Sequence, residues 1–138
     1  MAVLENADKF ELVSVDPSHF RPPWRKNGPP PPANDFHGYD ELGRTALEKA
    51  DQRTVIKAVS ASMAAWDGQP LKCGFEPRHA IVASSGSEVA EVLICYECGD
   101  VMTYFSGNEK GLNIARDQGA PLDKILTAAG IQLAPKAD

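Results

Sequence analysis

The chain has 138 residues, the size of one ordinary domain with a single hydrophobic core. Its hydrophobic fraction of 43% argues against a disordered chain, and its formal net charge of −5 argues against nucleic acid as a partner, because phosphate backbones are bound by clustered Lys and Arg. The N-terminal residues show no secretory signal, and no run approaches the roughly eighteen apolar residues of a membrane-spanning helix. Because the three cysteines are an odd number, we expect a cytosolic protein whose thiols are reduced or metal-bound.

The first predicted element is a short strand at Phe10–Val15, where side chains alternate in polarity and an Asp16-Pro17 turn signal follows. The arm that comes next, at about 17–37, has six of the chain's eleven prolines between Pro22 and Pro32. Proline fixes φ and lacks the backbone N–H, so we expect this arm to be extended rather than helical. Loops of such length inside a domain are commonly functional or mobile.

A second strand is predicted at Gly38–Leu47, after which the period of the apolar residues changes. Asp51 is the expected N-cap of a helix and Gly68 its stop signal. The apolar residues at helical spacing, which are expected to face the core, are Val55, Ile56, Val59, Met63 and Trp66.

Three further strands follow. His79–Ala83 and Val89–Tyr96 flank a turn with Gly86 and should form an antiparallel hairpin, and Val101–Phe105 should turn back beside them. A last helix fits Pro121–Ala129, with proline at its first position and a glycine just past its end. This order predicts one α+β domain over residues 1–138, a mainly antiparallel sheet of about five strands with two helices packed on it.

The most informative segment holds all three cysteines and one of the three histidines. Cys73, His79, Cys95 and Cys98 have the spacing C-x5-H-x15-C-x2-C. Three thiolates and one imidazole are an accepted tetrahedral set for zinc. Because an antiparallel hairpin brings the start of one strand beside the end of its partner, these four side chains should lie near one another. These four residues are therefore candidate ligands of a structural zinc ion, the one cofactor that the sequence suggests.

Other interpretations of the same cluster remain open. The cysteines can be buried thiols without metal, since Cys95 lies in an apolar run. A redox pair at Cys95 and Cys98 is disfavoured, because strand rather than helix is expected to follow and no helix dipole would lower a thiol pKa. A Cys nucleophile with His79 as its base fits the hairpin, but no oxyanion-stabilising group is visible and we assign no catalytic residue.

The arm carries a locally basic and aromatic patch formed by Phe20, Arg21, Trp24 and Arg25. Aromatic and Arg side chains are the usual anchors of protein interfaces, so these residues are the candidate partner-binding set. The alternative is that Phe20 and Trp24 pack against the domain and fix the long loop in place.

The segment Cys73…Pro77-Arg78-His79, followed by the sequence LICYEC, resembles a pattern found in a group of small bacterial proteins of unknown function. In that group a Gly-Tyr-x-x-Leu-Gly-x-Thr element and a helix come first, and Gly38–Thr45 and the helix after it match this order. The resemblance covers about residues 36–131, with LICYEC as its most specific part. It implies a similar fold and brings no established activity.

Together these observations favour a small cytosolic, non-enzymatic binding protein with a protein partner and with neither nucleic acid nor membrane as a target. An inhibitor, a regulator or a toxin-neutralising immunity protein has this profile of size and acidic charge. The alternative is a zinc-binding or thiol-based protein whose working part is the cluster of Cys73, His79, Cys95 and Cys98.

Overall fold

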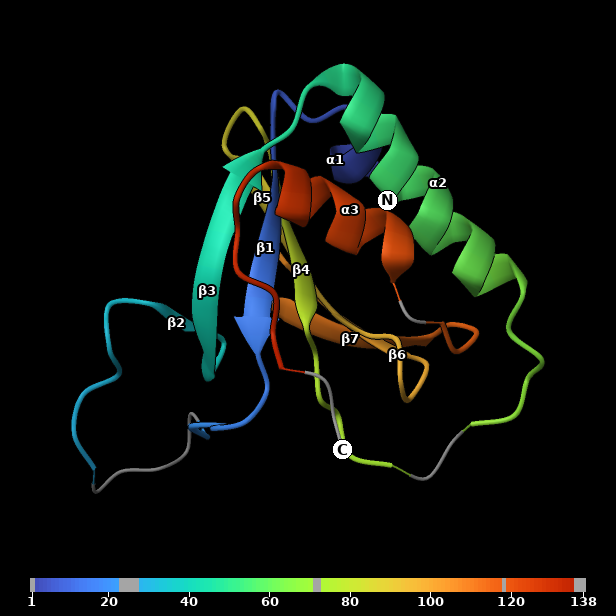
Figure 1. Ribbon diagram of the computed structural model, residues 1–138. Helices are drawn as coiled ribbons and strands as arrows, with labels where there is room; N and C mark the ends of the chain where they lie inside the picture. The colour runs from blue at the N-terminus through green and yellow to red at the C-terminus, as the bar shows by residue number, and fades with distance from the viewer. Residues whose placement is uncertain (1, 23–27, 71–72, 118, 136–138) are drawn as a thin grey trace.

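A computed structural model describes residues 2–22, 28–70, 73–117 and 119–135 (Figure 1). Seven strands form one sheet in the order β2-β3-β1-β4-β5-β6-β7, and every neighbouring pair is antiparallel. The elements in chain order are α1 (Ala2–Glu5), β1 (Lys9–Asp16), β2 (Asp35–Phe36), β3 (Tyr39–Ala46), α2 (Lys49–Ala64), β4 (His79–Ser85), β5 (Glu88–Cys95), β6 (Asp100–Phe105), β7 (Asn108–Asn113) and α3 (Ala120–Ala128).

The predicted α+β class and antiparallel sheet are confirmed, and the predicted number of about five strands is wrong. The two strands that were not predicted are β2, which has only two residues, and β7, whose sequence NEKGLN is polar and mostly exposed. A short helix, α1, also precedes the first strand. Neither β2 nor β7 has the apolar alternation that marks a half-buried strand.

The long helix α2 is confirmed with shifted ends. It begins at Lys49 after Glu48 rather than at Asp51, and it ends at Ala64, so the expected apolar residue Trp66 lies beyond it. Its buried residues are Gln52, Val55, Val59 and Ser62. Gln52 is tolerated there because its side-chain amide donates to the carbonyl of Leu47 (2.9 Å). Met63, expected in the core, is among the exposed hydrophobic side chains at 36%.

All three helices pack on one face of the sheet (Figure 1). Alternate residues of each strand point to this face, as the period of two requires. The helix-side core combines strand residues such as Leu12, Ile81 and Ile94 with helix residues such as Val55 and Leu122. Past α3 the chain runs back along the same side, where the Ser14 hydroxyl donates to the carbonyl of Gln132 (2.6 Å). The helices and the segment after α3 therefore cover one face of the sheet, and the arm lies on the opposite face.

The opposite face has a smaller core of its own, formed by Val13, Val15, Phe36, Tyr39, Ala80 and Leu93. The sheet curves around it. The β1–β3 register shifts between Ser14 and Val15, an irregularity of the kind that bends a strand. As a result His37, in the turn between β2 and β3, stacks on Tyr104 of β6 with ring centroids 3.7 Å apart, although β1, β4 and β5 lie between β3 and β6. This face is therefore concave.

Candidate functional site

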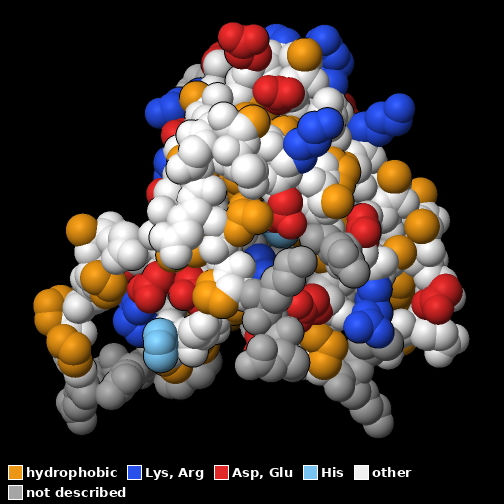
Figure 2. All heavy atoms as spheres, viewed as in Figure 1, with side chains coloured by type: hydrophobic (Ala, Val, Ile, Leu, Met, Phe, Trp, Pro, Cys, Tyr) orange, Lys and Arg blue, Asp and Glu red, His pale blue; other side chains and the backbone are white. Residues whose placement is uncertain are grey.

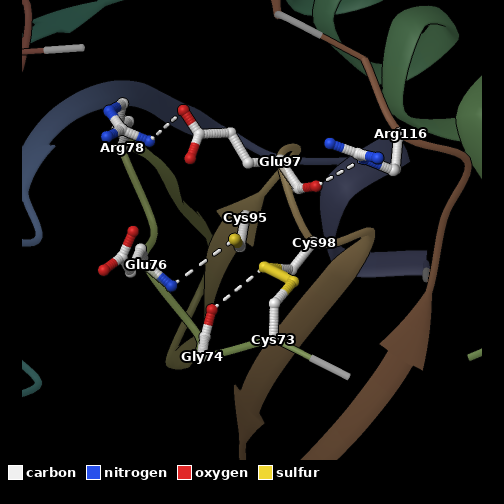
Figure 3. Close-up of a disulfide and its surroundings, with 8 residues drawn as sticks. All are labelled: Cys73, Gly74, Glu76, Arg78, Cys95, Glu97, Cys98 and Arg116. Atoms are coloured by element: carbon white, nitrogen blue, oxygen red, sulfur yellow. Dashed lines mark hydrogen bonds and ion pairs between the residues drawn. A yellow bond between two sulfur atoms is a disulfide. The ribbon is translucent and has the colours of Figure 1, made fainter. Parts of the chain in front are cut away.

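The Cys/His segment contains a disulfide between Cys73 and Cys98 (Figure 3). Cys73 lies in the connection between α2 and β4, and Cys98 lies in the turn between β5 and β6, with 5.9 Å between their Cα atoms. The Cys98 sulfur is 3.1 Å from the carbonyl oxygen of Gly74. The turn that carries Cys98 is held from outside, because Arg116 donates from Nε to the carbonyl of Glu97 (2.7 Å).

Cys95 is the cysteine outside this bond, and it is fully buried. Its sulfur accepts a hydrogen bond from the backbone N–H of Glu76 (3.4 Å). Burial raises the pKa of the Cys95 thiol, and this effect outweighs the backbone N–H groups of Glu76 and Cys98, which act in the opposite direction. Cys95 therefore stays protonated near neutral pH and is a poor nucleophile there.

His79 lies on the other face of the sheet from Cys95. It pairs with Ile94, and its Nε2 is 2.6 Å from Oδ1 of Asp123 in α3. A Cβ on Gly119 would be 2.8 Å from the His79 ring, so the ring is enclosed by the start of α3. His79 thus joins the hairpin to a helix.

The structure does not bring the four predicted zinc ligands together. The ends of β4 and β5 do meet, as the hairpin argument requires, but successive residues of a strand point to opposite faces. His79 and Ile94 share the helix side, which turns Cys95 to the concave side, while Cys73 and Cys98 are bonded to each other. Among the described residues no group of three or more Cys, His, Asp or Glu side chains could hold a metal ion.

The concave face holds a groove of about 640 Å³ between the arm and the sheet. Aromatic side chains from four separate segments line it: Phe20 from the arm, Tyr39 from β3, Phe75 from the α2–β4 connection and Tyr104 from β6. Phe20 packs against Tyr39 with ring centroids 4.8 Å apart, and Phe75 meets Tyr39 edge-on. Burial raises the pKa of Tyr39 to about 12 and also raises that of Tyr104, so both hydroxyls are neutral donors at physiological pH.

Arg21 fixes the base of the arm to the β2–β3 hairpin. Its Nε and one terminal nitrogen donate to Asp35 (3.0 and 2.8 Å), and its other terminal nitrogen is 2.8 Å from Asp40. These two carboxylates are direct cross-strand partners, so they would repel each other without the guanidinium between them. The backbone N–H of Arg21 also donates to the carbonyl of Gly38 (2.8 Å). The arm is thus attached at a defined position, and acidic and basic side chains lie together at the lower left of Figure 2.

His37 and Gly38 form the two-residue turn between Phe36 and Tyr39, and both have positive φ, +49° and +96°. Type I′ turns require this at both central residues, which is unusual for histidine. The His37 ring is held by its stack on Tyr104 and by Glu91, whose Oε1 is 3.2 Å from Nε2. The hydrogen bond from His37 keeps the pKa of Glu91 below its usual range.

Of the predicted partner-binding residues, Phe20 and Arg21 border the groove, and Trp24 and Arg25 lie outside the described residues. Phe20 packs on the domain yet is 43% exposed, whereas the Arg21 guanidinium is engaged by two carboxylates. Phe75, Met102 and Tyr104 also line the groove and were not among the predicted residues. The period of two in β6 was the available signal, since it puts Met102 and Tyr104 on one face.

Two features of the structure bear on the cellular location of the protein. In the part of the chain that the structure describes, none of the helices is both long and apolar enough to cross a membrane. The Cys73–Cys98 disulfide is weakly at odds with the cytosolic location expected from the sequence, because cytosolic thiols are normally kept reduced.

Comparison with known proteins gives no relative from which an activity could be transferred. No family model matches the chain, and no curated protein and no solved structure does so either. The concave groove, the disulfide beside it and the chemistry of their residues are therefore the basis for a function.

Proposed function

We propose that the protein is a non-enzymatic binding protein, and that it holds an extended, basic segment of a partner protein in the groove between the arm and the concave face of the sheet. The observation that carries this proposal is the groove itself, about 640 Å³ lined by side chains of Phe20, Tyr39, Phe75 and Tyr104. Aromatic-lined grooves are used to dock extended peptide segments, and buried aromatic side chains dominate the energetics of protein interfaces.

The groove is formed before any partner arrives, which supports a binding role. Arg21 attaches the arm, and His37 joins the hairpin turn to Tyr104 across the concave face. Side chains held in place in advance lose less conformational entropy on binding, so more of the contact energy contributes to affinity.

Charge supports a basic segment. The described residues around the groove include four carboxylates, those of Asp35, Asp40, Glu91 and Glu109. The basic groups there are the guanidinium of Arg21 and the imidazole of His37. Arg21 is already paired with two of these acids, and the whole chain carries a formal net charge of −5. Such a surface attracts cationic segments and repels anionic ones. An inhibitor, regulator or immunity protein that covers a basic site on its target would use such a groove.

Fluorescence anisotropy with two labelled peptides tests this function. One peptide is built from proline, leucine and arginine, and the other has each arginine replaced by glutamate. We expect the basic peptide to bind at least about tenfold more tightly than the acidic one, and Tyr104→Ala to weaken its binding about tenfold, the loss of one interface anchor. Leu133→Ala is the matched control, because Leu133 is an exposed apolar residue outside the groove. Equal affinity for both peptides, no binding of either, or equal effects of the two variants would refute the proposal.

A further inference from the structure

One wall of the groove is the short segment that follows Cys73. Phe75 lines the groove, and its carbonyl accepts a long hydrogen bond from the Tyr39 hydroxyl (3.5 Å). On one side of Phe75 the chain is bonded through Cys73 to Cys98, and on the other side the N–H of Glu76 donates to the Cys95 sulfur. Figure 3 shows this segment facing the β5–β6 turn that carries Cys98.

The two ends of the disulfide differ in how firmly they are held. The turn at Cys98 is buried and is fixed by the Arg116–Glu97 hydrogen bond, and the neighbouring Gly99 carbonyl accepts from the N–H of Ile114 (2.9 Å). Cys73 is exposed, as are the neighbouring Gly74 and the nearby Glu76. Breaking the disulfide would therefore release the segment with Phe75 and leave the turn in place.

We propose that the Cys73–Cys98 disulfide is a redox latch on the groove, reduced by a dithiol, and that its reduction releases the Phe75 wall and weakens partner binding. This inference rests on the proposed function for its effect on binding. In the reaction a thiolate of the dithiol attacks the exposed Cys73 sulfur, and the Cys98 thiolate leaves and takes up a proton. The second thiol of the reductant then resolves the mixed disulfide. The products are two protein thiols and one oxidised dithiol.

Burial of Cys95 keeps this disulfide from rearranging. Cys95 is only three positions before Cys98, and an attack by its thiolate would move the disulfide and free Cys73. Full burial and its raised pKa keep Cys95 in the unreactive thiol form, so the pairing of Cys73 with Cys98 persists until an external thiol acts.

The test compares the air-oxidised full-length protein with the same protein after dithiothreitol treatment, by hydrogen exchange and by anisotropy with the proline-leucine-arginine peptide. After reduction we expect at least about tenfold faster exchange at the amides of Phe75 and Glu76, and about tenfold weaker peptide binding, because binding must then order residues that the latch had fixed. Cys73→Ser should bind weakly without reductant and show no further response. Leu133→Ala, at an exposed residue outside the groove and the disulfide, is the control and should respond as the wild type does.

The outcomes separate the latch from the proposed function. If mass spectrometry of alkylated thiols shows Cys73 and Cys98 free after reduction while exchange and affinity stay unchanged, the latch is refuted and the binding function stands. If exchange at Phe75 and Glu76 rises but the peptide binds in neither state, the proposed function is refuted and redox release of the segment is upheld. Rapid alkylation of Cys73 and Cys98 in the oxidised protein refutes the latch without any variant.

Discussion

Replacement of Gly38 by alanine tests whether the arm is held against the hairpin. Gly38 has φ +96°, and a Cβ there would be 2.6 Å from the carbonyl oxygen of Arg21 and 2.6 Å from the ring of Phe20. The ring can rotate aside, but the carbonyl belongs to the backbone of the arm. Gly38→Ala must therefore displace the arm from the turn.

The expected loss of stability has two parts. An alanine in the left-handed region costs about 1–2 kcal/mol. Forcing an extra carbon into a filled space costs about 1–3 kcal/mol more. Gly107→Ala isolates the first part, because Gly107 is also the second residue of a two-residue turn, follows Ser106 with its own positive φ, and has no atom within 4 Å of an added Cβ. We expect Gly38→Ala to lose about 2–5 kcal/mol and Gly107→Ala about 1–2 kcal/mol.

Urea unfolding of both variants and the wild type, followed by circular dichroism, measures these losses from the transition midpoints at a common slope. Gly38→Ala should also weaken binding of the proline-leucine-arginine peptide, while Gly107→Ala leaves it unchanged. Equal losses of stability in the two variants would show that the arm does not pack against the turn in solution. The claim that the groove is formed before a partner binds would then be rejected.

Three further predictions concern stability and reactivity. Cys73→Ser should lower the free energy of unfolding by about 3.5 kcal/mol in non-reducing urea titrations, because the sequence separation of 25 between Cys73 and Cys98 closes a sizeable loop in the unfolded chain; an unchanged midpoint would exclude the disulfide. Burial raises the pKa of Tyr96 from 10.0 to about 12. The stability that depends on the neutral Tyr96 hydroxyl is therefore fully present below pH 10 and is lost as pH rises toward 12. Tyr96→Phe should reduce the fall in stability over this range by about 2 kcal/mol, and identical pH profiles would contradict the assignment. Iodoacetamide at pH 8 should modify the native oxidised protein slowly and at Cys95 alone, and fast labelling would contradict the burial of that thiol.

Short-range sequence patterns correctly predicted the helices and strands whose formation is signalled by their own residues and by the residues at their ends. Alternation identified the hairpin of β4 and β5, and the proline and glycine at the two ends of α3 marked that helix correctly. The strand β7 was missed because Leu112 is its single large apolar residue, which is too little to show a strand pattern. Its pairing otherwise uses the backbone and the Thr103 hydroxyl of β6, which donates to the carbonyl of Lys110 (3.1 Å). Such a strand is stable only beside β6.

The site was harder to predict because it depends on which face each residue occupies and on the curvature of the whole sheet. Spacing correctly brought the ends of β4 and β5 together, but His79 and Cys95 point to opposite faces. The groove joins residues far apart in the chain, and the stack of His37 on Tyr104 exists only because the sheet curls through three intervening strands. No short window of sequence contains that information.

The position of β1 in the sheet has a consequence for biosynthesis. β1 leaves the ribosome before the other strands of this sheet, yet it lies between β3 and β4. Its centre, from Leu12 to Val15, is fully buried in the folded protein, yet one edge of β1 has no partner until β4 is made, roughly 3–15 seconds later at ordinary rates of translation. By contrast, β4 to β7 form consecutive hairpins that can pair as they emerge. The nascent chain should therefore depend on chaperones most between the synthesis of β1 and that of β4.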